Sequence, residues 1–233
     1  GMSVATTARS HHGTVAHSTD GGHVLVLDDR VPEAFAPGSM VDLSTGEPAP
    51  ILATRLATGT PGRTSLPPVA LRVATTRGTN ALLEREVDPV AFFVTEGMRD
   101  LLVIGDQRRR DLFALEITKP NPLIAHVEEV SGRVSATGEE LSPLEIDQIA
   151  AAGRRVVSHG ITVAAVALMH AGRSPEHERA VAEILKEQGV EHVVCSHTIS
   201  AVPRIGPRAH ATVVDACLTG PVGVFLQEVA AVL

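Results

Sequence analysis

Apolar runs alternate with amphipathic segments along the second half of the chain. Residues 161–169 form a continuous apolar run and residues 191–196 a shorter one, a pattern typical of buried strands. Residues 143–159 and 175–188 place apolar positions at helical spacing, and each begins at the Pro of a Ser-Pro pair, with acidic residues in the first turn. Strands that are apolar on both faces and alternate with helices are typical of parallel sheets. We therefore predict an α/β fold in which helices flank a mixed or parallel sheet.

The pattern is weaker between residues 67 and 142. An apolar run at residues 69–74 predicts a strand that leads through a polar, Gly-containing turn at residues 75–80 into a helix over residues 81–86. Residues 90–94 predict the next buried strand, and residues 127–134 predict a further one. These elements extend the α/β pattern toward the N-terminus.

The two ends of the chain differ in character. Residues 1–22 are small and polar without periodic patterning, so we expect a poorly ordered tail before a strand at residues 23–28. Residues 31–67 form a Pro- and Gly-rich connection that holds only a short helix, around residues 51–56. Residues 212–233 predict a mostly apolar helix that bends at its Gly-Pro pair. The sequence thus predicts one folded domain over residues 23–233.

Composition excludes several classes of function. Twenty Lys and Arg against 27 Asp and Glu give a net charge of −7, which disfavours nucleic acid and anionic membranes as partners. The chain has no Tyr and no Trp to stack on bases. No apolar run reaches the roughly 18 residues of a membrane span, and Cys195 and Cys217 lie in apolar runs typical of reduced core thiols. We expect a cytoplasmic protein that binds neither nucleic acid nor membrane.

Three polar clusters are the candidate binding site, because parallel sheets bind ligands at the carboxyl ends of their strands. The candidates are Thr75, Thr76, Thr79 and Asn80, then Gln107 and Arg110, then Arg204, Arg208 and His210. Their hydroxyl, amide and cationic groups match a phosphate or a carboxylate. In the alternative interpretation, these groups only cap helices and pair with Asp106, Asp111 and Asp215.

Other catalytic and metal motifs are weak. Ser196, His197, His210 and Asp215 invite comparison with a hydrolase triad, but there is no G-x-S-x-G motif, and the last two lie about 140° apart around a helix. The histidines lack the spacing of a metal site, and neither G-x-x-x-x-G-K-[ST] nor G-x-G-x-x-G occurs. The sequence therefore predicts no metal ligands and assigns no general base.

Several longer motifs resemble the N-terminal domain of the hydantoinase A and 5-oxoprolinase family. They are residues 75–84, 95–102, 104–107 and 110–113. Residues 196–197, 204–210 and 214–216 resemble the 5-oxoprolinase branch more than the hydantoinase branch. The family usually begins with a phosphate loop, Asp-x-Gly-Gly-Thr-Phe-Thr-Asp, whose nearest match here is residues 19–23, without its threonines.

The resemblance implies an actin-like ATPase fold of the ribonuclease H-like type. It also implies ATP, Mg²⁺ and a monovalent cation such as K⁺ as cofactors of the complete enzyme. In this chemistry ATP phosphorylates the amide oxygen of 5-oxoproline, or of a hydantoin-like lactam, and water opens the ring. Relatives continue into a second actin-like domain, which we expect to be absent from this chain.

Two functional hypotheses follow. In the first, the chain is the N-terminal part of a cyclic amidohydrolase. In the alternative, it is a split or degenerate module without catalysis that assembles with a partner chain. Apolar residues of the terminal helix, among them Val222, Val224, Leu226 and Val229, predict an exposed patch and hence a homo-oligomer or a contact with a partner.

Overall fold

The computed structural model describes residues 46–62, 64–105, 113, 115 and 119–233, together with the backbone of four N-terminal strands. The chain divides into two compact units, residues 1–74 with 224–233, and residues 75–223. The single domain predicted over residues 23–233 is therefore shared between two units. Each unit is described by itself.

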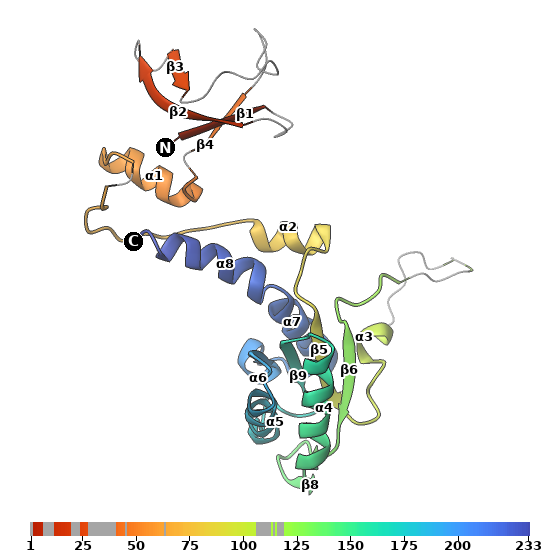
Figure 1. The fold of residues 1–233 in the computed structure, drawn as a ribbon. Helices are drawn as coiled ribbons and strands as arrows, with labels where there is room; N and C mark the ends of the chain where they lie inside the picture. Colours follow the sequence, from red (N-terminus) through yellow and green to blue (C-terminus); the bar gives the residue numbers. More distant parts are fainter. Residues whose placement is uncertain are drawn as a thin grey trace. The chain divides into compact units, whose positions relative to one another are not determined.

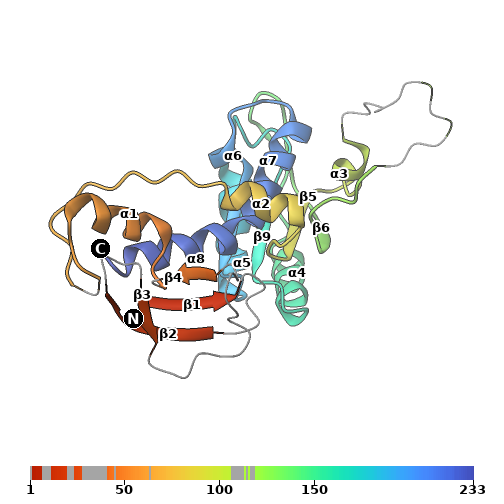
Figure 2. The ribbon, with the colours of Figure 1, turned by 90° about the horizontal axis from the view of Figure 1, so that it is seen from above.

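The first unit contains a four-stranded antiparallel sheet in the order β3-β2-β1-β4 (Figure 2). Its strands are β1 (Met2–Thr6), β2 (His12–Thr19), β3 (Val24–Leu27) and β4 (Val41–Ser44). β3 confirms the strand predicted at residues 23–28. β1 and β2 lie within residues 1–22, where the sequence predicts a tail. Backbone N–H and C=O groups form the ladder of an antiparallel sheet, and small polar residues can therefore pair without an alternating pattern.

Helix α1 (Ala49–Thr58) confirms the short helix predicted within the Pro- and Gly-rich connection. Ile51 of this helix forms a small apolar cluster with Phe225 and Val229. Leu71 packs against the same cluster. The strand predicted at residues 69–74 is wrong, because the structure assigns no strand there. An apolar run can bury a side chain against helices as well as in a sheet, and here Leu71 does so.

The second unit contains a four-stranded parallel sheet in the order β10-β9-β5-β6 (Figure 1). Its strands are β5 (Val90–Thr95), β6 (His126–Val130), β9 (Val163–Ala167) and β10 (His192–Cys195). The central strands β5 and β9 are buried along their whole length. The parallel sheet predicted from the apolar runs is confirmed, with strand ends that differ by one to a few residues.

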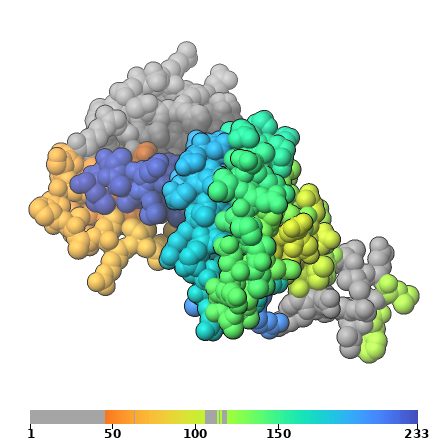
Figure 3. All heavy atoms as spheres, turned by 90° about the horizontal axis from the view of Figure 1, so that it is seen from below, coloured from red at the N-terminus to blue at the C-terminus, as the bar shows by residue number. Residues whose placement is uncertain are grey.

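Helices cover both faces of the parallel sheet. α4 (Ile146–Ser158) and α5 (Glu176–Glu187) pack on the face that contains Phe93, and they lie side by side in Figure 3. α7 (Ile205–Cys217) and the short α3 (Leu101–Ile104) pack on the opposite face. Successive residues of a strand point to opposite faces, so Phe92 lies in the core with α7 while Phe93 lies in the core with α4 and α5. The predicted helices at 143–159 and 175–188 are confirmed.

Four shorter elements also belong to the second unit. Helix α2 (Arg77–Glu84) precedes β5, α6 (Ser196–Ile199) follows β10, and β7 (Arg133–Val134) pairs with β8 (Glu140–Ser142). The predicted strand at 127–134 is thus divided between β6 and β7.

The C-terminal helix begins earlier and breaks earlier than predicted. α7 starts at Ile205 rather than near residue 212, and the break lies at Leu218, before α8 (Thr219–Ala230). Pro221 falls in the first turn of α8, where a missing N–H removes no helical hydrogen bond. In the described part of the chain no single helix is long and apolar enough to cross a membrane, although α7 and α8 together meet both criteria as a bent pair.

Candidate functional site at the carboxyl edge of the parallel sheet

The chain changes direction across the sheet between β5 and β9. β6 follows β5 along the chain and lies on one side of it, whereas β9 and then β10 lie on the other side. Open α/β sheets bind ligands at the carboxyl ends of the two strands that flank such a point. Thr95 ends β5, and its buried Oγ1 accepts a hydrogen bond of 2.9 Å from the backbone N–H of Met169, just beyond β9. This bond joins the two strand ends.

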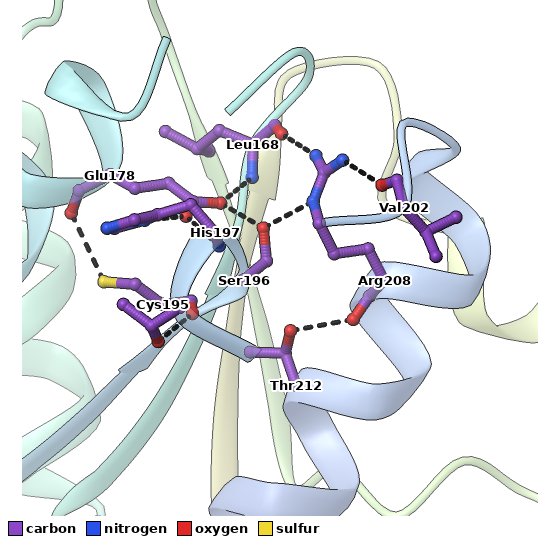
Figure 4. Close-up of polar contacts among 9 residues, drawn as sticks. Leu168, Glu178, Cys195, Ser196, His197, Val202, Arg208 and Thr212 are labelled. Atoms are coloured by element: carbon purple, nitrogen blue, oxygen red, sulfur yellow. Dashed lines mark hydrogen bonds and ion pairs between the residues drawn. The ribbon is translucent and has the colours of Figure 1, made fainter. Parts of the chain in front are cut away.

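Glu178 lies at the centre of the polar contacts at this edge (Figure 4). It lies in the first turn of α5, and its side chain is fully buried. Its Oε1 accepts hydrogen bonds from the backbone N–H of Leu168 (2.8 Å) and from Oγ of Ser196 (2.5 Å). Its Oε2 accepts from the backbone N–H of His197 (3.0 Å) and from the ring Nδ1 of the same residue (2.7 Å). Four donors thus surround one carboxylate and join α5 to the ends of β9 and β10.

Ser196 connects this carboxylate to a buried arginine. Nε of Arg208, on α7, donates to Oγ of Ser196 at 2.7 Å, so the hydroxyl accepts from the arginine and donates to Glu178. Nη2 of Arg208 donates to the carbonyl oxygen of Leu168 at 2.6 Å. Nη1 donates to the carbonyl oxygens of Val202 (3.1 Å) and Pro203 (3.2 Å). Both polar groups of the Leu168 backbone are therefore held, the N–H by Glu178 and the carbonyl by this guanidinium.

The charges of Glu178 and Arg208 compensate each other across Ser196. Burial lowers the pKa of the Arg208 guanidinium, and the negative charge of Glu178 opposes that shift. An unpaired buried charge is strongly destabilising, whereas a pair with hydrogen bonds on all sides is tolerated. Among the described residues no buried side-chain nitrogen or oxygen lacks a partner. The Glu178–Ser196–Arg208 network is therefore a stable frame for the strand ends.

His197 is the member of this arrangement that reaches solvent. Its side chain is 13% exposed, and its Nδ1 is bonded to Glu178. A carboxylate accepts hydrogen bonds, so Nδ1 carries the proton and Nε2 of the neutral ring is the unprotonated nitrogen. Within the described residues Nε2 has no hydrogen bond and is not enclosed. The site therefore presents one oriented ring nitrogen that can exchange a proton.

One group in the described part of the chain brings metal-ligating atoms together. Glu178, Cys195 and His197 place one such atom each within 4.8 Å of one another. Burial, and secondarily the charge of Glu178, raises the pKa of the Cys195 thiol to about 12, so it stays protonated, and it lies 3.6 Å from the carbonyl oxygen of Glu178. Both carboxylate oxygens already accept two hydrogen bonds each. These groups are committed to internal contacts rather than arranged for a cation.

The first predicted cluster lies on α2. Thr75, Thr76, Thr79 and Asn80 are all exposed around the start of this helix. Oγ1 of Thr75 accepts a hydrogen bond of 3.2 Å from the backbone N–H of Arg77. No side chain caps the helix. Most of the polar groups of this cluster are therefore open to solvent.

The other predicted residues have different environments. Arg204 and His210 are exposed at the start of α7, and Nδ1 of His210 bonds the carbonyl oxygen of Gly206 at 2.9 Å. Arg208 is fully buried with its donors engaged, so it acts within the frame. Gln107 and Arg110 lie outside the described residues.

The structure does not bring the first and third clusters together. A methyl group placed on Gly78 of α2 would lie 3.3 Å from Leu218, just beyond the end of α7. That end is near the start of β5, because Asp88 N–H donates to the carbonyl oxygen of Cys217 at 3.1 Å. Arg208 lies nine residues earlier on α7, about 14 Å along its axis. The structure therefore separates the described residues of these two clusters, and a shared ligand site for them stays a prediction.

Two residues at this edge of the sheet, Glu178 and Thr95, were not among the predicted site residues. Glu178 was recognised only as an acidic residue in the first turn of a helix, and Thr95 only as part of a motif. A carboxylate that begins a helix directly after a buried parallel strand must lie near the carboxyl edge of the sheet, and this signal could have identified Glu178.

Comparison with known proteins places these observations in a family. Residues 53–189 match the family model described as the hydantoinase/oxoprolinase N-terminal region. The 5-oxoprolinase of Saccharomyces cerevisiae is 35% identical over 189 residues, and the match covers 70% of this chain and 15% of the yeast protein. The acetophenone carboxylase gamma subunit of Aromatoleum aromaticum is 30% identical, with 84% of this chain and 29% of the subunit covered.

A solved structure supports the same relationship. The ATP-dependent caprolactamase of Pseudomonas jessenii matches with a TM-score of 0.61 and 26% identity, over 68% of this chain and 24% of that chain. The chain thus spans less than a third of the length of each of these three proteins. The resemblance inferred from the motifs is confirmed.

Proposed function

Because the chain belongs to the hydantoinase/oxoprolinase N-terminal family, we propose that it is the N-terminal part of an enzyme that opens a cyclic amide with ATP. The observation that carries the proposal is the match of residues 53–189, which includes β5, β9 and Glu178. Two relatives are a 5-oxoprolinase and an ATP-dependent caprolactamase, whose names both refer to a lactam. The substrate we propose is 5-oxoproline or a hydantoin-like lactam, and the complete enzyme has an actin-like ATPase fold.

The proposed reaction overcomes the poor reactivity of an amide. Transfer of a phosphoryl group from ATP to the amide oxygen turns the amide carbon into a centre that water can attack. The C–N bond then breaks and the ring opens to an acyl phosphate, which a second water hydrolyses to the carboxylate and inorganic phosphate. With 5-oxoproline the product is glutamate.

The described residues do not fit the proposed Mg²⁺ or K⁺. Mg²⁺ prefers oxygen ligands with ideal octahedral geometry. The one group of three possible ligands contains a protonated thiol, and its carboxylate already accepts four hydrogen bonds. We therefore assign the cation sites to the complete enzyme and not to this group of residues.

The proposal is tested with this chain fused to, or mixed with, a polypeptide that supplies the part of a family member beyond its N-terminal region. Phosphate release and the ring-opened product are measured with 5-oxoproline, hydantoin and caprolactam, with and without ATP. We expect at least one of these cyclic amides to yield its ring-opened product only when ATP is present. Absence of lactam-dependent phosphate release for all three compounds would contradict the proposal.

A second function is supported by the relationship to a carboxylase subunit. The match to the acetophenone carboxylase gamma subunit covers more of this chain than the match to the yeast protein does. In this proposal the chain assembles with a partner chain, or with itself, and has no activity alone. Sedimentation velocity of the chain, alone and with a separately expressed remainder of the family sequence, tests it. A chain that stays monomeric in both samples would exclude this second function.

A further inference from the structure

His197 is held more firmly than an ordinary surface histidine. Its backbone N–H and its ring Nδ1 both donate to Oε2 of Glu178, at 3.0 and 2.7 Å, so main chain and side chain share one anchor. The anchor is itself fixed, because Oε1 of Glu178 accepts from Leu168 N–H and Ser196 Oγ. Figure 4 shows the ring beside the carboxylate, between Glu178 and Cys195. The ring is therefore fixed in both orientation and tautomer.

The charges around the ring favour proton transfer at Nε2. Glu178 accepts the Nδ1–H bond and so stabilises the ring when Nε2 gains a proton, as the buried carboxylate of a catalytic triad does. Arg208 lies on the far side of Ser196 and compensates the carboxylate charge. The Cys195 thiol is the third titratable group near the ring, and it is protonated. These groups therefore leave Nε2 as the one ring atom that can accept a proton and release it again.

We propose that His197 is the acid–base residue of ring opening, an inference that rests on the proposed function. Nε2 takes a proton from water as the water oxygen bonds to the phosphorylated amide carbon. The same proton then moves from Nε2 to the ring nitrogen as the C–N bond breaks and its electron pair stays on nitrogen. Water thus supplies an oxygen to carbon and a proton to nitrogen, and the remaining hydroxyl proton passes to solvent as the C=O bond of the acyl phosphate forms. His197 returns to its neutral form with Nδ1–H still on Glu178.

The decisive variant is His197→Asn. The Asn side-chain amide can donate to Glu178 in place of Nδ1–H, but it has no nitrogen that exchanges a proton as Nε2 does. His192→Asn is the matched control, because His192 is exposed at the other end of β10. Both are made in the complete enzyme of the activity test, and kcat/KM is measured against pH. We expect H197N to lower kcat/KM by a factor of about 10² to 10⁴ and to abolish the dependence on the histidine ionisation, with H192N unchanged.

The outcomes separate this inference from the proposed function. If the parent opens a lactam and H197N keeps the parental rate and pH profile, His197 is not the acid–base residue, although the proposed function stands. If the parent opens no lactam, both fail.

A measurement on the parent protein covers the case in which H197N does not fold. Diethyl pyrocarbonate acylates unprotonated imidazole nitrogens, and the modified histidines are identified by mass spectrometry. We expect activity to fall in step with the modification of His197. Full activity after complete modification of His197 would overturn the proposal.

Discussion

Two polar regions of the second unit contrast in how their groups are used. At the carboxyl edge of the sheet, Glu178 and Arg208 are fully buried, and their polar groups bond to other groups of the folded chain. On α2, Thr75 to Asn80 expose their hydroxyl and amide groups, and one backbone N–H bonds to one of them. The first region is a structural frame with one open ring nitrogen, and the second is an open set of donors.

The contrast shows that charge type alone does not identify a binding residue. Arg208 has the chemistry to bind a phosphate, yet its donors hold the carbonyl oxygens of Leu168, Val202 and Pro203. His197 is less conspicuous in the sequence, yet it is the residue whose second nitrogen remains available. Access, rather than charge, separates the functional side chain from the structural one.

The largest expected effect comes from removing the buried guanidinium. Arg208→Met keeps much of the side-chain volume but leaves Glu178 without its compensating charge. Loss of one partner of a buried charge pair costs about 3–5 kcal/mol, so we expect most of the stability to be lost in urea denaturation followed by circular dichroism. Arg204→Met, at an exposed position of the same helix, should change the free energy of unfolding by no more than about 0.5 kcal/mol. Equal losses of unfolding free energy in the two variants would show that the buried arginine is no more important for stability than the exposed one.

Thr95→Val tests the bond between the ends of β5 and β9. The substitution keeps the shape of the side chain but leaves the partly buried N–H of Met169 without its acceptor. We expect a loss of about 1–3 kcal/mol in the free energy of unfolding. The control is Thr79→Val, which makes the same change at an exposed position on α2 and should have little effect. A loss confined to Thr79→Val would reverse the assignment of the two regions.

An ion pair on the edge strand β6 is intermediate between the two regions in its exposure to solvent. Oε2 of Glu128 lies 2.8 Å from Nη2 of Arg155, which is half exposed, and Oε1 lies 2.9 Å from Nε2 of His126. Burial alone would raise the pKa of Glu128, but the hydrogen bonds from Arg155 and His126 outweigh it and lower the pKa below 4.5. The lowered pKa means that this stabilisation is complete above pH 4.5 and is lost as the pH falls through the folded-state pKa.

Urea denaturation of the parent and of Glu128→Gln measures this contribution. At pH 7 we expect the parent to be more stable by no more than about 1 kcal/mol, because the pair is partly exposed. The difference should shrink toward zero as the pH is lowered from 5 to 3. A difference that grows on acidification would show that the pKa of Glu128 is raised rather than lowered.

The smallest expected effect on stability is that of Asn80→Ala. The side chain is exposed on α2, and we expect a change within about 0.5 kcal/mol. The prediction that this cluster binds a phosphate or a carboxylate is tested on the same variant by calorimetric titration of Mg-ATP and 5-oxoproline. If the parent binds one of these ligands and Asn80→Ala binds it equally well, Asn80 is not part of the binding site.

Much of the fold could be predicted from local pattern. The strands and helices between residues 143 and 196 follow from apolar runs and acidic first turns, which act over a few residues. The Ser-Pro pair marks the start of α5, whereas α4 begins at Ile146, three residues after its Pro. The apolar run at 69–74 failed as a strand because hydrophobicity predicts burial but does not supply a pairing partner. The division of the chain into two units depends on distant segments, since residues 224–233 join residues 1–74.

The candidate site could be predicted only in part. Ser196 and Arg208 were recognised, but their contact with Glu178 depends on the register that places Cys195 beside Val166. That register joins residues about thirty positions apart, and no short motif records it. The burial of Arg208 by the chain around Leu168 is likewise a property of the folded sheet.

The central claim is that Glu178 fixes the ring of His197 and leaves Nε2 available. Long-range ¹H–¹⁵N NMR correlation of the histidine rings tests it directly, because the nitrogen shifts distinguish the two neutral tautomers. His197→Asn assigns the signal, and the exposed His192 serves as the internal reference. The structure predicts that neutral His197 carries its proton on Nδ1. A neutral ring protonated on Nε2 would contradict both the Glu178 hydrogen bond and the role proposed for His197.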